Sequence, residues 1–225
     1  MTSATNNYSN SSKFQHKISK NHYYEVFDLF GGLKIIIDFL MNTGDIILIQ
    51  SNFKGPYAWW SYAISKWTRS PWTHVAVIFQ AKNDEFYVLE SAEESGVWGV
   101  QVHPYNEYLK MYNGNFLVIR HLYQNKLTRR DILQRIEVIL NTLGSTNYDT
   151  SLFDLLATAF QTDKIGNPRN LNKMYCSALV AYFYTQMGWF NPSTEWTLIQ
   201  PKHFSKENQI HLQPGVRLGD YYAIV

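Results

Sequence analysis

Residues 73–91 read THVAVIFQAKNDEFYVLES, and this stretch contains two short segments rich in β-branched and aromatic residues. Segments of this kind favour strands, so we predict one strand at His74–Gln80 and a second at Glu85–Ser91. The polar residues Lys82-Asn83-Asp84 between them are typical of a turn. The stretch therefore predicts an antiparallel β-hairpin.

The register of this hairpin brings two ionisable side chains together. If the turn centres on Asn83, the numbers of paired residues sum to about 166, which sets Glu90 opposite Ala76. Side chains alternate along a strand, so Glu90 and His74 share one face as diagonal neighbours. We expect the carboxylate to accept a hydrogen bond from the imidazole. A slip of one residue would instead leave Glu90 an exposed strand carboxylate.

The rest of the chain predicts an α+β fold, in which an antiparallel sheet packs against helices. Further strands are expected at Ile46–Ile49, Gly96–Val102 and Asn115–Arg120, and helices within Tyr24–Leu40 and at Ala58–Trp67, Thr128–Leu143, Ser151–Phe160 and Cys176–Met187. The clearest helix starts at Thr128 as N-cap, with Asp131 three residues on. The strands gather in the first half of the chain instead of alternating with helices, which favours an antiparallel sheet.

Length and composition suit a single domain. Of the 225 residues, 45% are hydrophobic and 17% are charged, which is enough to fill one hydrophobic core and to keep its surface in contact with water. Residues 1–20 are polar and rich in Ser and Asn, so we predict a flexible tail there and a single domain over residues 21–225.

The charge and the cysteine content limit which binding partners and which cellular compartment suit the chain. The formal net charge of +2, with acids and bases interspersed, argues against nucleic acid as a partner. No apolar run approaches the roughly 20 residues of a transmembrane helix, and the N-terminus lacks a signal-peptide core. Peripheral contact with a membrane stays compatible with the sequence. The single cysteine rules out an intrachain disulfide, so a reducing compartment fits best.

That cysteine, Cys176, sits at the predicted start of a helix. Unpaired N–H groups and the positive end of the helix dipole stabilise a thiolate at this position. Two other interpretations remain: Cys176 is a small buried hydrophobe, and His74 is a hydrogen-bonded core or surface histidine. Nucleophilic catalysis requires a base beside the thiol, a third group to orient the base, and donors for the oxyanion.

Four stretches, in order along the chain, carry a family resemblance. They are Gly44-Asp45-Ile46-Ile47, Thr73-His74-Val75-Ala76-Val77, Leu89-Glu90-Ser91 with Gly96-Val97, and Tyr175-Cys176-Ser177-Ala178-Leu179-Val180. Their order resembles the circularly permuted branch of the NlpC/P60 papain-like superfamily, which includes YiiX-type bacterial proteins and related poxvirus proteins. The similarity extends over about residues 45–210. This chain departs from the family in Ala178, where relatives commonly carry Glu, and in Ala76, where they commonly carry Gly.

The resemblance implies a papain-like catalytic domain and a thiol hydrolase of the cysteine protease or amidase type. Cys176 is then the nucleophile, His74 its base and Glu90 the residue that orients the base. The implied substrate is peptide-like or acyl-bearing, with an amide, ester or thioester bond to cleave, and no cofactor is implied. Two alternatives stay open: a lipid acyltransferase or phospholipase of the lecithin:retinol type, and a non-catalytic binding module on the same fold.

Aromatic residues near these positions are candidates for substrate binding. Trp72 closes a group of four tryptophans ahead of His74, and Tyr148 and Tyr175 precede Cys176. Each of the three is equally a candidate for core packing. We expect no metal site, because neither an H-E-x-x-H motif nor a cysteine pair is present.

Overall fold

The computed structural model describes residues 41–54, 58–94, 97–143, 147–148, 173–208 and 210–224. Residues Asn42–Val225 form one compact unit. The predicted tail at residues 1–20 and the helices predicted near residues 24–40 and 151–160 lie outside the described residues. The prediction of a single domain over residues 21–225 therefore stays a prediction.

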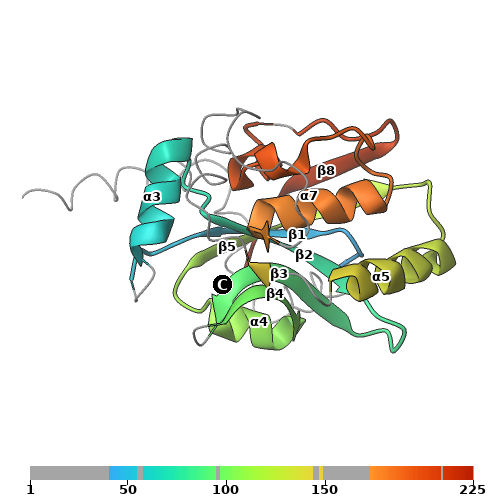
Figure 1. Cartoon of the computed structure of the whole chain (residues 1–225), viewed down its shortest axis with the longest axis horizontal. Coiled ribbons are helices and arrows are strands. Elements are labelled where there is room, and N and C mark those ends of the chain that lie inside the picture. The colour runs from blue at the N-terminus through green and yellow to red at the C-terminus, as the bar shows by residue number, and fades with distance from the viewer. Residues whose placement is uncertain are drawn as a thin grey trace, which may run out of the picture. The chain divides into compact units, whose positions relative to one another are not determined.

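The described strands form one sheet with the order β7-β6-β4-β3-β2-β1-β5-β8 (Figure 1). Their bounds are β1 Ile46–Gln50, β2 His74–Gln80, β3 Phe86–Glu94, β4 Val97–Pro104, β5 Phe116–Gln124, β6 Asn147–Tyr148, β7 Lys173–Met174 and β8 Val216–Ile224. Neighbouring strands run antiparallel except β6 and β7, a parallel pair of two-residue strands. The predicted α+β class with an antiparallel sheet is confirmed.

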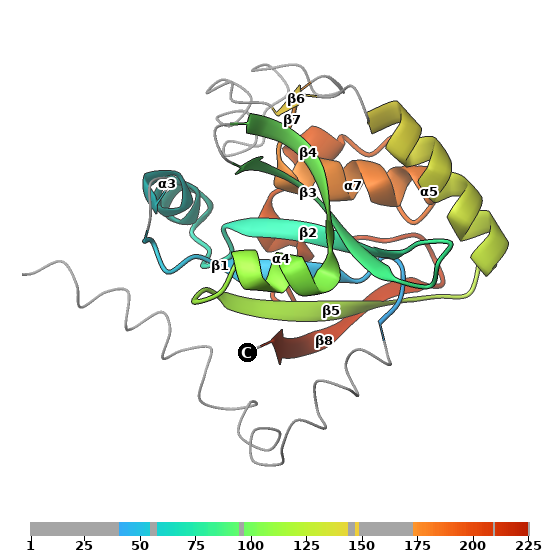
Figure 2. The ribbon, with the colours of Figure 1, turned by 90° about the horizontal axis from the view of Figure 1, so that it is seen from below.

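Four α-helices are described, and two of them cover opposite faces of the sheet. Their bounds are α3 Ala58–Thr68, α4 Tyr105–Met111, α5 Arg129–Leu143 and α7 Cys176–Gln186, and two 3₁₀ turns follow at Trp196–Leu198 and Pro201–Phe204. Figure 2 shows α4 in front of the strands and α7 behind them. The predicted cap of α5 is present, because Thr128 N–H and Oγ1–H both donate to Asp131 Oδ2, at 3.0 and 2.7 Å.

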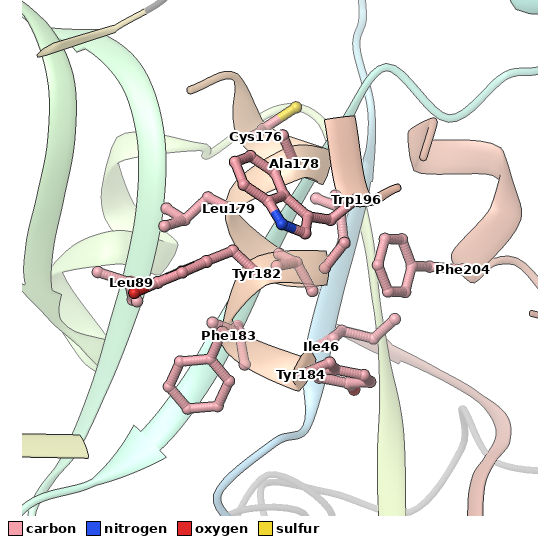
Figure 3. Close-up of a cluster of buried hydrophobic side chains, with 14 of the residues drawn as sticks. Ile46, Leu89, Cys176, Ala178, Leu179, Tyr182, Phe183, Tyr184, Trp196 and Phe204 are labelled. Atoms are coloured by element: carbon pink, nitrogen blue, oxygen red, sulfur yellow. The ribbon is translucent and has the colours of Figure 1, made fainter. Parts of the chain in front are cut away.

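The main apolar core lies between α7 and the sheet. Ile46 and Leu89 from the strands meet Leu179 and Phe183 from α7, and Phe204 closes one side (Figure 3). All five side chains are fully buried, and burial of each stabilises the fold by about 1.5–3 kcal/mol. This packing fixes the helix, and with it the position of its first residue, Cys176.

Helix α4 and strand β8 were not predicted, and nor were the short strands β6 and β7 and the two 3₁₀ turns. Helix α4 has only seven residues, too few to show a helical period. Strand β8 contains Gly219 and Asp220, which are unfavourable in strands, and its pairing with β5 is interrupted at these two residues, between Leu218 and Tyr221. In β8, pairing with β5 on either side of this interruption outweighs the local preference.

Candidate active site

The site forms where β2 and β3 diverge. The hairpin has the predicted register, with Val77 paired with Leu89 and Ile78 with Val88. Pairing between the strands stops at Val77 and Leu89, while β3 continues beside β4 as far as Glu94. The side chains of His74 and Glu90 therefore lie just beyond the end of the β2–β3 ladder.

His74 and Glu90 form a short hydrogen bond. His74 Nε2 lies 2.7 Å from Glu90 Oε2, and the side chains are 15% and 0% exposed. The hydrogen bond that the register predicts is present. Because Nε2 bonds the carboxylate, Nδ1 is the ring nitrogen left for a second partner.

The pair is held in its charged form. Burial acts to lower the pKa of His74, because it disfavours the imidazolium. The charge of Cys176 and a side-chain hydrogen bond between His74 and Cys176 act in the opposite direction. With the hydrogen bond and charge of Glu90 added, the pKa of His74 is raised to about 10. Burial also acts to raise the pKa of Glu90, yet the hydrogen bond and charge of His74 and a bond from Tyr112 hold it below its ordinary value. At neutral pH these shifts favour imidazolium beside carboxylate.

Cys176 is the first residue of α7. The residue before it, Tyr175, occupies the N-cap position and supplies no side-chain hydrogen bond to the first turn. Figure 3 shows the sulfur at the start of the helix, at one end of the buried cluster, and the residue is 6% exposed. The Cys176 side chain interacts electrostatically with both His74 and Tyr112. The structure thus brings together the three residues predicted as nucleophile, base and orienting group.

Tyr108 of α4 and Tyr112, the C-cap residue of that helix, complete the surroundings of Glu90, and the sequence analysis missed both. Tyr112 Oη donates to Glu90 Oε2 at 2.7 Å, and Tyr108 Oη donates to the same oxygen at 3.3 Å. The available signal was the spacing of Tyr105, Tyr108 and Tyr112, which places them on one face of a helix. Nothing in that spacing identified Glu90 as their partner.

His103 also approaches the carboxylate. Its Nε2 lies 3.4 Å from Glu90 Oε1 and 3.1 Å from Gln101 Oε1. Glu90 therefore lies between two histidines, one on each carboxylate oxygen, and His103 belongs to the surroundings of the site.

Asp45 and His121 form a second buried acid–histidine pair, with Oδ2 and Nδ1 2.7 Å apart. Asp45 also accepts backbone N–H bonds from Leu122 at 2.8 Å and Asn42 at 2.9 Å. These contacts tie β1 to β5, so the Gly-Asp element of the sequence has a structural role.

The three candidates for substrate binding differ in their surroundings. Trp72 is 1% exposed and packs against Phe116 and Tyr221, so its indole lies in the core. Tyr175 is 9% exposed at the start of α7. Tyr148 is in β6, and its side chain lies outside the described part of the structure.

Residues 40–212 match the model of a family described as permuted papain-like amidase enzyme, YaeF/YiiX, C92 family. No curated protein matches the chain significantly. Among the described residues, no helix is long and apolar enough to cross a membrane. Within the same residues, no group of three or more His, Cys, Asp or Glu side chains is arranged to hold a metal ion.

Proposed function

The chain belongs to the permuted papain-like amidase family, and from this membership we propose that it is a cysteine hydrolase with Cys176 as nucleophile, His74 as base and Glu90 as the orienting carboxylate. The observation that carries the proposal is the 2.7 Å bond between His74 Nε2 and Glu90 Oε2. This bond leaves Nδ1 for the thiol that begins α7.

The proposed reaction begins with the proton of Cys176 on His74 Nδ1. The thiolate attacks the carbonyl carbon of an amide, ester or thioester, a C–S bond forms, and the carbonyl π electrons move to oxygen. N–H groups in the first turn of α7, at Cys176 and Ser177, are the proposed donors to this oxyanion. His74 Nδ1–H then protonates the leaving group as its bond to carbon breaks.

The second half of the reaction releases the acyl group. Neutral His74 takes a proton from water, the resulting hydroxide adds to the thioester, and the C–S bond breaks to return the thiolate and a free acid. Glu90 accepts the Nε2–H bond throughout and stays ionised. An amine or alcohol in place of water would make the same steps an acyl transfer.

The test is the pH dependence of iodoacetamide alkylation, compared in the wild type and His74→Ala. Cys176 is the chain's single cysteine, so all thiol labelling reports on it. We expect the wild type to react down to about pH 6, well below the ordinary thiol pKa of about 8.5, and His74→Ala to lose this reactivity. Identical profiles for the two proteins contradict the proposal and favour the non-catalytic binding module.

A second candidate, a hydrolase or acyltransferase acting on membrane lipids, is favoured by the surface of α3. Trp59, Tyr62 and Trp67 are 58%, 57% and 43% exposed, and the helix carries Lys66 and no acidic residue. Tryptophan, tyrosine and lysine together are typical of a helix that binds the membrane interface. The helix ends at Thr68, shortly before His74, and Figure 2 shows it beside the end of the sheet where β2 begins.

Vesicle binding tests this second candidate. We expect the full chain to co-sediment with phosphatidylglycerol vesicles more than with phosphatidylcholine vesicles, and the double variant Trp59→Ala/Trp67→Ala to lose binding. Val138→Ala is the matched control, because Val138 is 59% exposed on α5. Equal binding by the double variant and the control would exclude α3 as the membrane contact.

A further inference from the structure

Tyr108 of α4 and Tyr112, the C-cap residue of that helix, direct their hydroxyls at one oxygen of Glu90. Glu90 Oε2 accepts from Tyr112 at 2.7 Å and from Tyr108 at 3.3 Å, and it also bonds His74 Nε2 at 2.7 Å. The carboxylate is fully buried, so these donors replace the water that would otherwise solvate its charge. Neither tyrosine is a member of the core cluster between α7 and the sheet, and α4 lies on the opposite face of the sheet.

The position of Tyr112 is fixed by its own backbone. Its N–H donates to Tyr108 O at 3.3 Å, and its carbonyl accepts from Asn115 Nδ2 at 3.1 Å. Asn115 Oδ1 in turn accepts the Asn52 N–H at 3.0 Å, which anchors this turn to the segment after β1. The hydroxyl is therefore delivered to Glu90 from a tethered residue.

The aromatic rings also contact the imidazole. The Tyr112 ring stacks on His74, with centroids 5.6 Å apart and an angle of 18° between the planes. Tyr108 packs against Tyr112 at 4.7 Å. The imidazole is thus held on its face by one tyrosine and through Nε2 by the carboxylate that both tyrosines bond.

We propose that Tyr108 and Tyr112 are positioning residues, which keep Glu90 ionised and aim its Oε2 at His74 Nε2, so that Nδ1 stays turned toward Cys176. The inference rests on the function proposed above. It adds a role for α4, an element that holds neither the nucleophile nor the base.

The charged groups around Glu90 are consistent with this role. Among the described residues, the titratable side chains that face the site are those of His74 on β2, His103 on β4, Tyr108 on α4, Tyr112 at its C-cap and Cys176 on α7. Burial and the charge of Glu90 raise the pKa of both tyrosines well above the ordinary value. They stay protonated across the working range and act as donors to the carboxylate.

The experiment measures the titration of Glu90 by NMR in protein labelled with ¹³C at glutamate carboxyl groups, with the resonance assigned by its loss in Glu90→Gln. Tyr112→Phe keeps the stacked ring and removes the hydroxyl. We expect the Glu90 titration to move up by about one pH unit, because a hydrogen bond to the charged form is lost. Tyr108→Phe, with the longer bond, should give a smaller upward shift.

A matched control is Tyr87→Phe, which removes an exposed hydroxyl that bonds Glu85 Oε2 at 3.0 Å. It should leave the titration of Glu90 unchanged. At pH values where Glu90 becomes protonated, Tyr112→Phe should lose up to about ten-fold in the rate of Cys176 alkylation, while its melting temperature stays close to that of Tyr87→Phe.

The outcomes separate this inference from the proposed function. An unchanged Glu90 titration in Tyr112→Phe overturns the inference, even where wild-type Cys176 shows activation that depends on His74. A wild-type Cys176 that reacts no faster than in His74→Ala overturns the proposed function, whatever the tyrosine variants do to Glu90, and removes the catalytic role of the tyrosines with it.

Discussion

Glu90→Gln should weaken the activation of Cys176 while leaving its surroundings almost the same in shape. The amide keeps the size of the carboxylate but loses the negative charge that lies 2.7 Å from His74 Nε2. Without that charge the imidazolium is less favoured, and so is the thiolate that it stabilises. The variant therefore tests the link from Glu90 through His74 to Cys176.

The size of the effect follows from the lost bond. A hydrogen bond to a charged group contributes about 1.5–3 kcal/mol, and one pH unit corresponds to about 1.4 kcal/mol. We therefore expect the acid limb of the alkylation profile to move up by about one to two pH units. At a fixed pH on that limb, this is a loss of roughly ten- to a hundred-fold in rate.

The assay is the second-order rate of iodoacetamide alkylation between about pH 5 and 9, followed by intact mass. Glu137→Gln is the matched control, because this carboxylate is 59% exposed in an ion pair with Lys82, and such a pair contributes little. Superimposable profiles for Glu90→Gln and Glu137→Gln would refute the argument that Glu90 acts on Cys176 through His74.

Three further predictions concern stability and pH. Gly44→Ala should lower the free energy of unfolding, measured in urea melts, by about 2–4 kcal/mol. The reason is that Gly44 has φ +99° and that a Cβ at this position would overlap Leu122 and Trp189. A change below about 0.5 kcal/mol, which is typical of a surface substitution, would contradict this prediction. Trp72→Ala should cost about 3–5 kcal/mol by leaving a cavity, whereas an unchanged melting temperature would indicate that Trp72 is not a core residue. The pKa of His74 is raised from 6.5 to about 10, so protonated His74 stabilises the folded state fully below pH 6.5, and this contribution is lost as pH rises through about 10. The unfolding free energies of the wild type and His74→Ala should therefore converge between these two pH values. A difference that stays constant with pH would contradict the raised pKa.

Much of the hairpin could be predicted from local pattern. Alternation along His74–Gln80 and the polar turn at Asn83 determined the register, and the register put Glu90 beside His74. This worked because strand pairing in a short hairpin depends on the turn and on side-chain alternation, both of which are local properties.

The surroundings of Glu90 could not be predicted in the same way. Tyr112 is 22 residues from Glu90 in sequence, and it reaches the carboxylate only because α4 folds back over β3 and β4. His103 approaches the same group from β4, the strand paired with β3. A histidine and two tyrosines without a motif carry no local signal of a shared partner.

The sequence by itself determined the hairpin register, the capped helix α5 and a cysteine at a helix start, since each depends on neighbours within a few residues. Only the tertiary structure decided that β2 and β3 part beyond Val77 and Leu89, and that Trp72 lies in the core. The physical reason is that these features arise from packing between elements distant in the chain, whose free energy no local pattern records.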